Sequence, residues 1–437
     1  MKRQIHLNLF IYARGHHEAA WRHSKAPDRS LMDIHHYVVC ARKAEAACFD
    51  SIFLADVLNL PPDADASARI WLEPLTTLSA LAMATSRIGL IGTASTTHTE
   101  PFNLARQFAS LDHISSGRAA WNIVTSFSAA GSRNFDSSGR LPHADRYARG
   151  DEFVEVVKKL WDSWSDDAVV DDREAGTFYV KERVCPIDHD GDYYHIAGPL
   201  NLPRPPQGRP VIVQAGSSEA GKDFAAKHAE AVFTAHMHQS TAQAFYGDLK
   251  RRVGAADRRP DQCLVLPGIS VMIAGTEAEA KRMEAELNET SDVATGLTRL
   301  SDRFDGHDFS QIPLDRVLTV DDFPDPAANE SSRGRTELIV GAVAREALTM
   351  RQLLGKLAGA RGHFVIAGTP EQVADAMEAW VDEGAADGFN VMPLLLPHKL
   401  DVFADEVVPI LQRRGRFRTA YEGKTLRDHY NLDRPPA

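Results

Sequence analysis

Pro210-Val-Ile-Val-Gln-Ala-Gly-Ser-Ser-Glu-Ala-Gly221 is the stretch of sequence that decides the predicted fold. Within it, Val211-Ile-Val213 is short, apolar and β-branched, which is typical of a strand buried on both faces. Ala215-Gly-Ser-Ser218 is a turn of small residues, and helical spacing begins at Glu219. A strand that leads through a short turn into a helix is the repeating unit of α/β proteins with a parallel sheet.

The same turn is a candidate phosphate site. Free backbone N–H groups at the start of the helix and the dipole of the helix both favour an anion at this position. Gly216 lets the backbone approach a ligand closely, and Ser217 and Ser218 supply hydroxyl donors. The alternative interpretation is an ordinary turn in which a serine caps the helix.

Seven further apolar segments have the character of buried strands and alternate with segments of helical spacing. They are residues 4–12, 51–56, 88–93, 119–125, 231–235, 264–274 and 388–393. Eight alternating units favour an α/β fold of the closed (β/α)8 TIM barrel type over an open sheet. We therefore predict one barrel domain over residues 1–437, with insertions at about 165–209 and 290–340 that are long enough to act as lids.

Composition narrows the class of function. The chain has 437 residues and a net charge of −11, so no basic face is evident that would neutralise nucleic-acid phosphates. No apolar run approaches the roughly 20 residues that span a bilayer. The four cysteines, Cys40, Cys48, Cys185 and Cys263, have no metal or redox spacing. We expect a cytoplasmic protein that binds neither nucleic acid nor membrane.

Polar residues at predicted strand ends are the first candidates for a site, because a barrel enzyme acts at the carboxyl ends of its strands. Asp56, Thr93, Asn122 and Thr125 occupy such positions. Asp56 is an acceptor for a ring N–H or a hydroxyl of a ligand, or else caps a helix or joins a salt bridge at the rim.

His143 and Tyr147 stand four residues apart at the start of a strongly amphipathic helix, so helical geometry would place them on one face. In one interpretation the imidazole and the phenol point at the same ligand. In the alternative, this segment caps the helix and the tyrosine packs on the barrel rim. His17, Trp21 and Arg22 follow the first strand and are candidates for holding an aromatic or anionic substrate. Packing at the barrel rim is the alternative for these three.

A metal site has weaker support in the sequence. His236-Met-His238 ends the sixth strand, and two histidines at this spacing can chelate a metal. No second cluster supplies a third ligand, so we predict no metal. The sequence also lacks the phosphate-binding loop of nucleotide hydrolases, the zinc-protease helix motif and the glycine fingerprint of dinucleotide-binding folds.

Five segments together resemble the bacterial-luciferase-like flavin monooxygenases, and in particular the branch that contains the nitrilotriacetate, EDTA and dibenzothiophene sulfone monooxygenases. They are Trp121–Ser126, Asn134-Phe135, His143–Val154, Pro206–Ser218 and Phe364–Val373. The resemblance extends over nearly the whole chain. It implies a (β/α)8 barrel, in agreement with the strand count.

The resemblance also implies a cofactor and partners. FMN would serve as a reduced co-substrate supplied by a separate NAD(P)H:flavin reductase, and O2 would oxygenate a small organic substrate with cleavage of a C–N or C–S bond, as in the degradation of xenobiotics. A homo-oligomer is implied as well. By position, FMN contacts would come from Asp56, Thr93, His143, Tyr147, the Gly216 backbone and Ser217 or Ser218, with Asn122 and Thr125 beside the ring.

His143 would have a catalytic role under this resemblance, as a hydrogen-bond partner of the oxygenated flavin. Two other readings stay open. One is a barrel of the same fold that uses a deazaflavin for hydride transfer. The other is of a different class, either a barrel that binds flavin without catalysis or a metal hydrolase built on His236 and His238.

Overall fold

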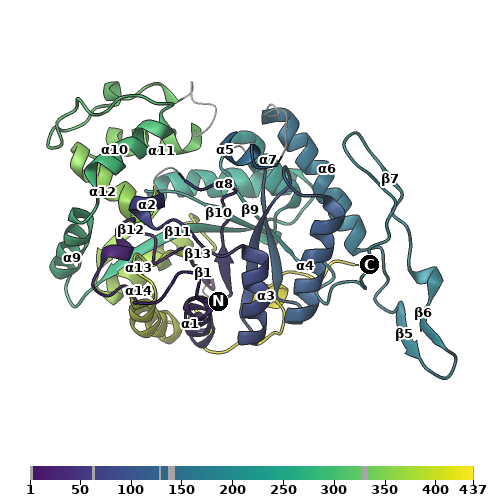
Figure 1. Ribbon diagram of the computed structural model, residues 1–437. Helices are drawn as coiled ribbons and strands as arrows, with labels where there is room; N and C mark the ends of the chain where they lie inside the picture. Colours follow the sequence, from purple (N-terminus) through teal and green to yellow (C-terminus); the bar gives the residue numbers. More distant parts are fainter. Residues whose placement is uncertain (1–2, 62–63, 127–128, 136–142, 327–332, 437) are drawn as a thin grey trace.

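The computed structural model describes residues 3–61, 64–126, 129–135, 143–326 and 333–436 (Figure 1). Eight parallel strands close into a barrel, which confirms the predicted fold class. They are β1 (His6–Phe10), β2 (Ser51–Leu54), β3 (Gly89–Ser95), β4 (Ala119–Val124), β9 (Val211–Ala215), β10 (Ala231–Thr234), β11 (Leu264–Ile273) and β13 (Gly388–Val391). The ring runs β10-β9-β4-β3-β2-β1-β13-β11 and is closed by pairing of β11 with β10.

A ninth strand, β12 (Phe364–Gly368), lies beside the barrel and was not predicted. It pairs with Ile269–Ile273, the second half of β11, whereas Leu264–Pro267 pairs with β10 in the ring. β11 is ten residues long, so it extends beyond the ring and offers its free edge to β12. Residues 364–373 carry part of the family resemblance, but the sequence analysis does not predict a strand there.

Helices cover the outside of the ring and begin at recognisable caps. The principal ones are α1 (Ile34–Ala46), α3 (Pro74–Ala84), α4 (Pro101–Ser115), α6 (His143–Trp161), α7 (Glu219–His228), α8 (Gln239–Ala255), α9 (Glu277–Glu289) and α13 (Pro370–Asp382). Thr369 caps α13 and is followed by proline, a pair of residues that is typical of a helix start. Within the described parts of the chain, no helix is long and apolar enough to cross a membrane.

Residues 342–357 have the apolar spacing of one continuous helix, which predicts a single helix, but the chain forms two helices there. α11 (Arg333–Arg345) ends before Leu348, and α12 (Met350–Ala360) begins after it. The Thr349 side chain accepts from the Gln352 N–H, and the Gln352 side chain accepts from the Thr349 N–H. This reciprocal cap starts a new helix in a segment whose apolar spacing alone indicated a continuous one.

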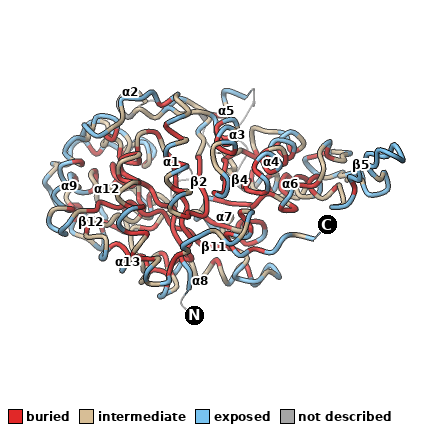
Figure 2. Tube along the Cα trace, turned by 90° about the horizontal axis from the view of Figure 1, so that it is seen from below, coloured by how far each residue is buried: buried red, intermediate tan, exposed pale blue. Residues whose placement is uncertain are grey.

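The two insertions lie at opposite ends of the molecule (Figures 1 and 2). Residues 165–209 form two short hairpins, as expected: β5 (Val169–Asp172) with β6 (Thr177–Tyr179), and β7 (His189–Asp190) with β8 (His195–Ile196). These hairpins project beyond α6. The second insertion contains α10 (Val293–Arg303) and the first part of α11, which lie with α12 at the other end of the barrel.

The barrel interior is apolar, and the C-terminal segment fills one end of it. Phe10 and Phe53 pack with ring centroids 4.6 Å apart. Leu426 and Tyr430, from the chain terminus, belong to the same buried cluster. The Tyr430 hydroxyl donates to Asn8 Oδ1 at 2.8 Å, so the terminus is attached to β1. The other end, at the carboxyl ends of the strands, remains available for a site.

Asp50 anchors the same closed end. Its side chain is fully buried, contacts Arg418, accepts from the Leu7 N–H at 2.7 Å and lies 3.0 Å from His6 Nδ1. Burial by itself raises the pKa of Asp50, but the charges of Arg418 and His6 outweigh it and hold the pKa below its ordinary value. The ionised carboxylate therefore stabilises the fold.

We expect Asp50→Ala to lower the free energy of unfolding by about 3–5 kcal/mol, because it leaves a buried guanidinium without its partner. Urea unfolding at pH 7 measures the change. Asp405→Ala is the control: Asp405 is largely exposed and pairs with Lys43, so its loss costs about 0–1 kcal/mol. The stabilising contribution of Asp50 is complete above about pH 4 and is lost as the pH falls through the lower folded-state pKa. Equal losses in the two variants would contradict the assignment.

Candidate active site

Two strand-end side chains are held together by hydrogen bonds inside the rim. Thr93 on β3 and Asn122 on β4 are register partners. The Asn122 amide donates to Thr93 Oγ1 at 2.9 Å, and Thr93 donates to the Leu54 carbonyl at 2.9 Å. Asn122 Oδ1 is buried and accepts no hydrogen bond within the described parts of the chain. A buried acceptor without a partner costs stability, so this oxygen is suited to a donor on a bound molecule.

Gln214, at the end of β9, presents a similar atom. The residue is 4% exposed, and its Oε1 also has no hydrogen-bond partner in the part of the chain that is described. Asn122 and Gln214 stand on neighbouring strands. The register pairs Asn122 with Val213 and Gln214 with Ile123, so the two side chains leave opposite faces of the sheet. The two unsatisfied oxygens therefore do not mark one shared ligand position.

The turn after β9 begins a helix with a serine cap, which is the alternative interpretation of this stretch. Binding of an anion at this turn stays a prediction, and we call the turn the candidate anion seat. Ser218 caps α7, and its Oγ accepts from the Gly221 N–H at 3.1 Å. Tyr147, from α6, directs its hydroxyl to the same turn: the oxygen lies 3.1 Å from the position that a Cβ atom would take on Gly221. Ser217 Oγ lies 2.8 Å from the corresponding position on Gly334. Two serines and a phenol therefore surround the N-terminus of a ten-residue helix.

His143 and Thr125 are both associated with α6: His143 begins this helix, and Thr125 contacts it. His143 begins the helix, so it stands one turn before Tyr147 as predicted, and its side chain lies outside the described residues. Thr125 follows β4 and contacts Gly150: its methyl carbon is 3.2 Å from where a Cβ atom on that glycine would be. Gly216 faces the Gln214 side chain, whose Nε2 is 2.5 Å from the ideal Cβ position.

Asp56 follows β2, the strand next to β3 in the ring. Its carboxylate accepts from the Val57 N–H at 2.8 Å, and burial, with Glu73 nearby, raises its pKa. Trp71 is beside it and packs on Tyr12, with ring centroids 5.0 Å apart. Asp56 is thus connected to the end of β1 rather than to the Thr93–Asn122 pair.

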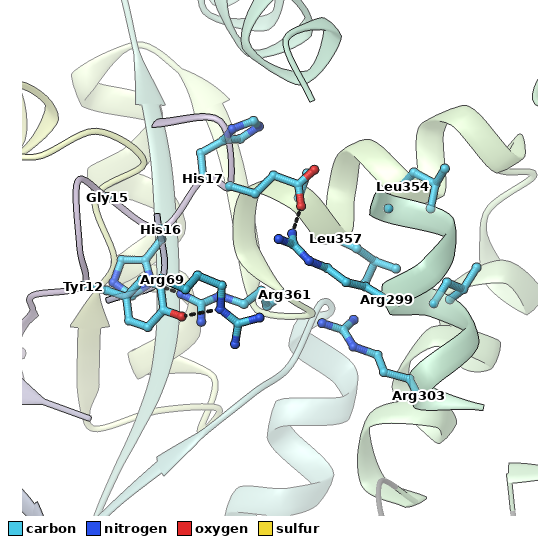
Figure 3. Close-up of a pocket in the computed structure, with 14 residues that line it drawn as sticks. Tyr12, Gly15, His16, His17, Arg69, Arg299, Arg303, Leu354, Leu357 and Arg361 are labelled. Atoms are coloured by element: carbon cyan, nitrogen blue, oxygen red, sulfur yellow. Dashed lines mark hydrogen bonds and ion pairs between the residues drawn. The ribbon is translucent and has the colours of Figure 1, made fainter. Parts of the chain in front are cut away.

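A cavity of about 630 Å³, including its open mouth, lies next to Tyr12 (Figure 3). Its walls come from the loop after β1, the loop after β2, α10 and the end of α12. The lining residues are Tyr12, Gly15, His16, His17, Glu18, Arg69, Gly296, Arg299, Leu300, Arg303, Leu354, Leu357, Ala358 and Arg361. The second insertion thus covers one side of the cavity through α10, whereas residues 165–209 line none of it. Only the second insertion is therefore placed to act as a lid over this cavity.

His17 is a wall of this cavity and is neutral. Its Nδ1 accepts from the Ala19 N–H at 3.2 Å, and its Nε2 donates to Asn288 Oδ1 at 3.1 Å. Burial lowers the pKa of His17 to about 4. Trp21 is 41% exposed and is absent from the cavity lining, and Arg22 donates to the Thr290 carbonyl at 3.0 Å. The structure brings His17 to the cavity and places Trp21 and Arg22 beside its outer wall, so their roles in substrate binding stay predictions.

Sequence reasoning missed the strongest feature of the cavity, its arginines. Arg361 lies 3.9 Å above the centre of the Tyr12 ring and donates from Nη2 to His16 Nδ1 at 2.9 Å. Arg69 donates from Nε to the Tyr12 hydroxyl at 3.0 Å. The four arginines of the lining come from three segments, and only Arg299 and Arg303, four residues apart on α10, are related by their spacing in the sequence.

His236 and His238, the two candidate metal ligands, lie in different surroundings. His236 is buried, with Nε2 3.1 Å from Thr234 Oγ1, whereas His238 Nε2 lies 3.2 Å from a Glu346 carboxylate oxygen. Among the residues that the structure describes, no three His, Cys, Asp or Glu side chains gather in a way that could hold a metal ion.

A closed parallel barrel with a capped helix start and an unsatisfied buried acceptor at its rim, and with a charged cavity beside them, has the features of a barrel enzyme's ligand-binding end. A family model described as luciferase-like monooxygenase matches residues 10–387. The chain belongs to the family of luciferase-like monooxygenases, which confirms the resemblance found in the sequence.

Individual proteins of known name match over the full chain. The N-acetyl-S-(2-succino)cysteine monooxygenase of Bacillus subtilis (strain 168) is 46% identical, with 99% of this chain and 98% of the relative covered. Nitrilotriacetate monooxygenase component A of Aminobacter aminovorans is 45% identical, with 99% and 97% covered. The crystal structure of riboflavin lyase with modified FMN and riboflavin superposes with a TM-score of 0.87 at 29% identity, and 100% of this chain and 97% of that chain are covered.

The arginines of the cavity make a prediction about Tyr12. Burial raises the pKa of Tyr12, but the charges of Arg361 and Arg69 outweigh it, so the pKa lies below its ordinary value. We expect Arg361→Gln to raise the pKa of Tyr12, because one of the two charges is removed. Difference absorbance of the phenolate around pH 10 measures the shift, and Tyr12→Phe assigns the signal. An unchanged titration would show that the guanidinium does not act on the phenol.

Proposed function

We propose that this monooxygenase is the oxygenating component of a two-component system and uses FMN in its reduced form as a co-substrate. The observation that carries the proposal is the candidate anion seat at α7, where Ser217, Ser218 and Tyr147 surround the helix N-terminus. A cofactor with a terminal phosphate fits such a seat. The family, and a structural neighbour solved with modified FMN, support the same cofactor.

The rim residues fit the remainder of a flavin. Asn122 Oδ1 is a buried acceptor without a partner, and a flavin ring and its ribityl chain carry N–H and O–H donors. The Thr93–Asn122 hydrogen bond fixes the amide so that its oxygen faces away from Thr93. We propose Thr125 and the Gly216 backbone as further contacts, and Asp56 as an acceptor on the opposite side of the ring.

Reduced FMN, when bound, supplies the two electrons with which O2 is split between the substrate and water. The protein has to hold the substrate beside the cofactor and exclude bulk water. The cavity next to Tyr12 is suited to hold the substrate, and α10 covers it. His143 at the start of α6 is proposed to hydrogen-bond the reacting oxygen, which its position one turn from Tyr147 supports.

A separate protein is proposed to supply the reduced flavin. Nitrilotriacetate monooxygenase carries the name component A, which describes one part of a system with more than one component. An NAD(P)H:flavin reductase would be the second component. The reduced flavin would reach this protein through solution or in a transient complex.

The names of the relatives also support a type of reaction. Nitrilotriacetate carries its acetate arms on nitrogen, and N-acetyl-S-(2-succino)cysteine carries a succinate arm on sulfur. We propose that one oxygen atom of O2 enters the carbon beside such a heteroatom. The resulting carbinol collapses to a carbonyl, the C–N or C–S bond breaks, and the heteroatom leaves with a proton. The second oxygen atom leaves as water, and FMN is released oxidised.

The candidate anion seat can be tested by binding. We expect Tyr147→Phe and Ser217→Ala each to weaken reduced-FMN binding by about tenfold to a hundredfold, because each removes a hydrogen bond to a charged group. Anaerobic titration followed by flavin fluorescence or absorbance measures the affinity. Riboflavin, which lacks the phosphate, should bind the variants and the unchanged protein with similar affinity. Tyr179→Phe, on the exposed hairpin, is the matched control.

The reaction is tested by turnover. Nitrilotriacetate and N-acetyl-S-(2-succino)cysteine are offered with photoreduced FMN and O2, and the amine, thiol and carbonyl products are followed by mass spectrometry. We expect product from at least one compound, dependent on both reduced FMN and O2. Failure to bind reduced FMN, together with binding of a reduced deazaflavin, would replace the proposal with hydride transfer.

A further inference from the structure

The phenol ring of Tyr12 is held in place by packing on several sides. It stacks on the His16 imidazole with ring centroids 5.3 Å apart, and it packs against Phe10 at 5.9 Å and Trp71 at 5.0 Å. The Arg361 guanidinium lies over the same ring. These contacts fix the orientation of the ring, so the hydroxyl group has a defined position at the wall of the cavity.

The Tyr12 hydroxyl accepts a hydrogen bond but donates none within the described parts of the chain. Its oxygen accepts from Arg69 Nε at 3.0 Å, and Figure 3 shows the phenol beside Arg69 and Arg361. A phenol has one O–H donor in addition to its acceptor lone pairs. Because the residue lines the cavity and its hydrogen has no acceptor among the described residues, this hydrogen is available to a molecule bound in the cavity.

Two guanidinium groups favour loss of the Tyr12 proton. Arg69 donates to the phenol oxygen, and Arg361 lies 3.9 Å from the centre of the ring. Arg361 is itself held by His16, whose Nδ1 accepts from Arg361 Nη2 at 2.9 Å while its Nε2 donates to the Phe10 carbonyl at 3.0 Å. Fixed positive groups beside an oxygen that loses a proton stabilise the anion without reorganisation. The surroundings of Tyr12 therefore suit a phenol that gives a proton and takes one back.

The other lining groups that could exchange a proton are occupied. Both ring nitrogens of His16 have the partners just described, and those of His17 are bonded to the Ala19 N–H and to Asn288. Glu18 forms an ion pair with Arg299. The guanidinium groups stay protonated at neutral pH. Among the described residues that line the cavity, Tyr12 is thus the group with a proton to offer.

Collapse of the carbinol in the proposed reaction needs a group of this kind. The O–H hydrogen of the carbinol leaves as the C=O bond forms. The C–N or C–S bond breaks with its electron pair on the heteroatom, which gains a proton. The carbinol oxygen and the heteroatom are bonded to the same carbon, so one phenol oxygen can serve both. A proton given to the heteroatom and a proton taken from the carbinol leave the phenol as it was.

We propose that Tyr12 is a catalytic residue that acts as acid and base in the cleavage step. Its hydroxyl donates a proton to the leaving nitrogen or sulfur, and the phenolate, stabilised by Arg69 and Arg361, takes the proton of the carbinol hydroxyl. This inference rests on the proposed function, because it assigns a residue to the reaction of the same site. The step needs no oxidant or reductant beyond those of the oxygenation that precedes it.

The experiment follows turnover of nitrilotriacetate and N-acetyl-S-(2-succino)cysteine with photoreduced FMN and O2, quenched at intervals and analysed by mass spectrometry. We expect Tyr12→Phe, which keeps the ring and removes the hydroxyl, to slow release of the carbonyl product about a hundredfold to ten-thousandfold. Uncleaved substrate that carries one added oxygen should accumulate. KM and the affinity for reduced FMN should change by less than about threefold. Tyr193→Phe, in the exposed turn between β7 and β8, is the matched control and should react like the unchanged protein.

The pH dependence of the rate is a second readout, which a structural role of the hydroxyl would not move. The protonated phenol is the active form, so the rate falls as the pH rises through the pKa of Tyr12. The charged groups that face the phenol are Arg69 and Arg361, and His16 beside them is neutral because burial lowers its pKa. Arg361→Gln removes one positive charge, so the fall in rate should move to higher pH. Tyr12→Phe should lack this fall.

The outcomes separate this inference from the proposed function. Cleavage at the full rate in Tyr12→Phe, or a loss confined to KM, would overturn the inference and leave the flavin proposal intact. Slow turnover without accumulation of oxygenated substrate would place the role of Tyr12 before cleavage and would overturn it as well. Loss of affinity for reduced FMN in Tyr12→Phe would assign the phenol to the cofactor, with the same consequence. Product from neither compound with the unchanged protein would refute the proposed cleavage reaction itself, and this inference with it.

Discussion

Closure of eight parallel strands into a ring is the constraint on which the rest of the molecule depends. In a parallel ring every strand ends at the same rim, so residues distant in sequence meet there without any further device. The opposite end must be closed by something else, and here the chain terminus does it through Tyr430 and the Asp50–Arg418 pair. With one end filled, the carboxyl ends of the strands are left to carry a site.

Features carried by a contiguous stretch could be predicted from the sequence. The eight strands appear as short apolar runs, and the helix start at Thr369-Pro370 appears as a cap followed by proline. The strand, turn and helix that contain the candidate anion seat are of the same kind, because they follow one another within Pro210–Gly221. Even so, the hydroxyl of Tyr147 reaches the seat from another helix, and only the resemblance to a family had connected the two.

Features that depend on convergence could not be predicted. The guanidiniums of the cavity come from the loop after β2, from α10 and from the end of α12, and nothing in the spacing of Arg69, Arg303 and Arg361 relates them. Length made both insertions candidates for a lid, yet only the second contributes to the cavity. The break between α11 and α12 depends on a reciprocal cap at Thr349, which a search for apolar periodicity overlooks.

The first turn of α11 connects the two halves of the proposed site. Gly334 lies against Ser217 at the candidate anion seat, and its neighbour Arg335 reaches the Arg361 carbonyl and approaches His363 Nε2 at 3.5 Å. The same insertion supplies Arg303 through α10. Adjacent residues at one helix start therefore contact both the turn after β9 and the wall of the cavity beside Tyr12, so the first turn of α11 is a direct physical connection between the two parts of the site that we propose.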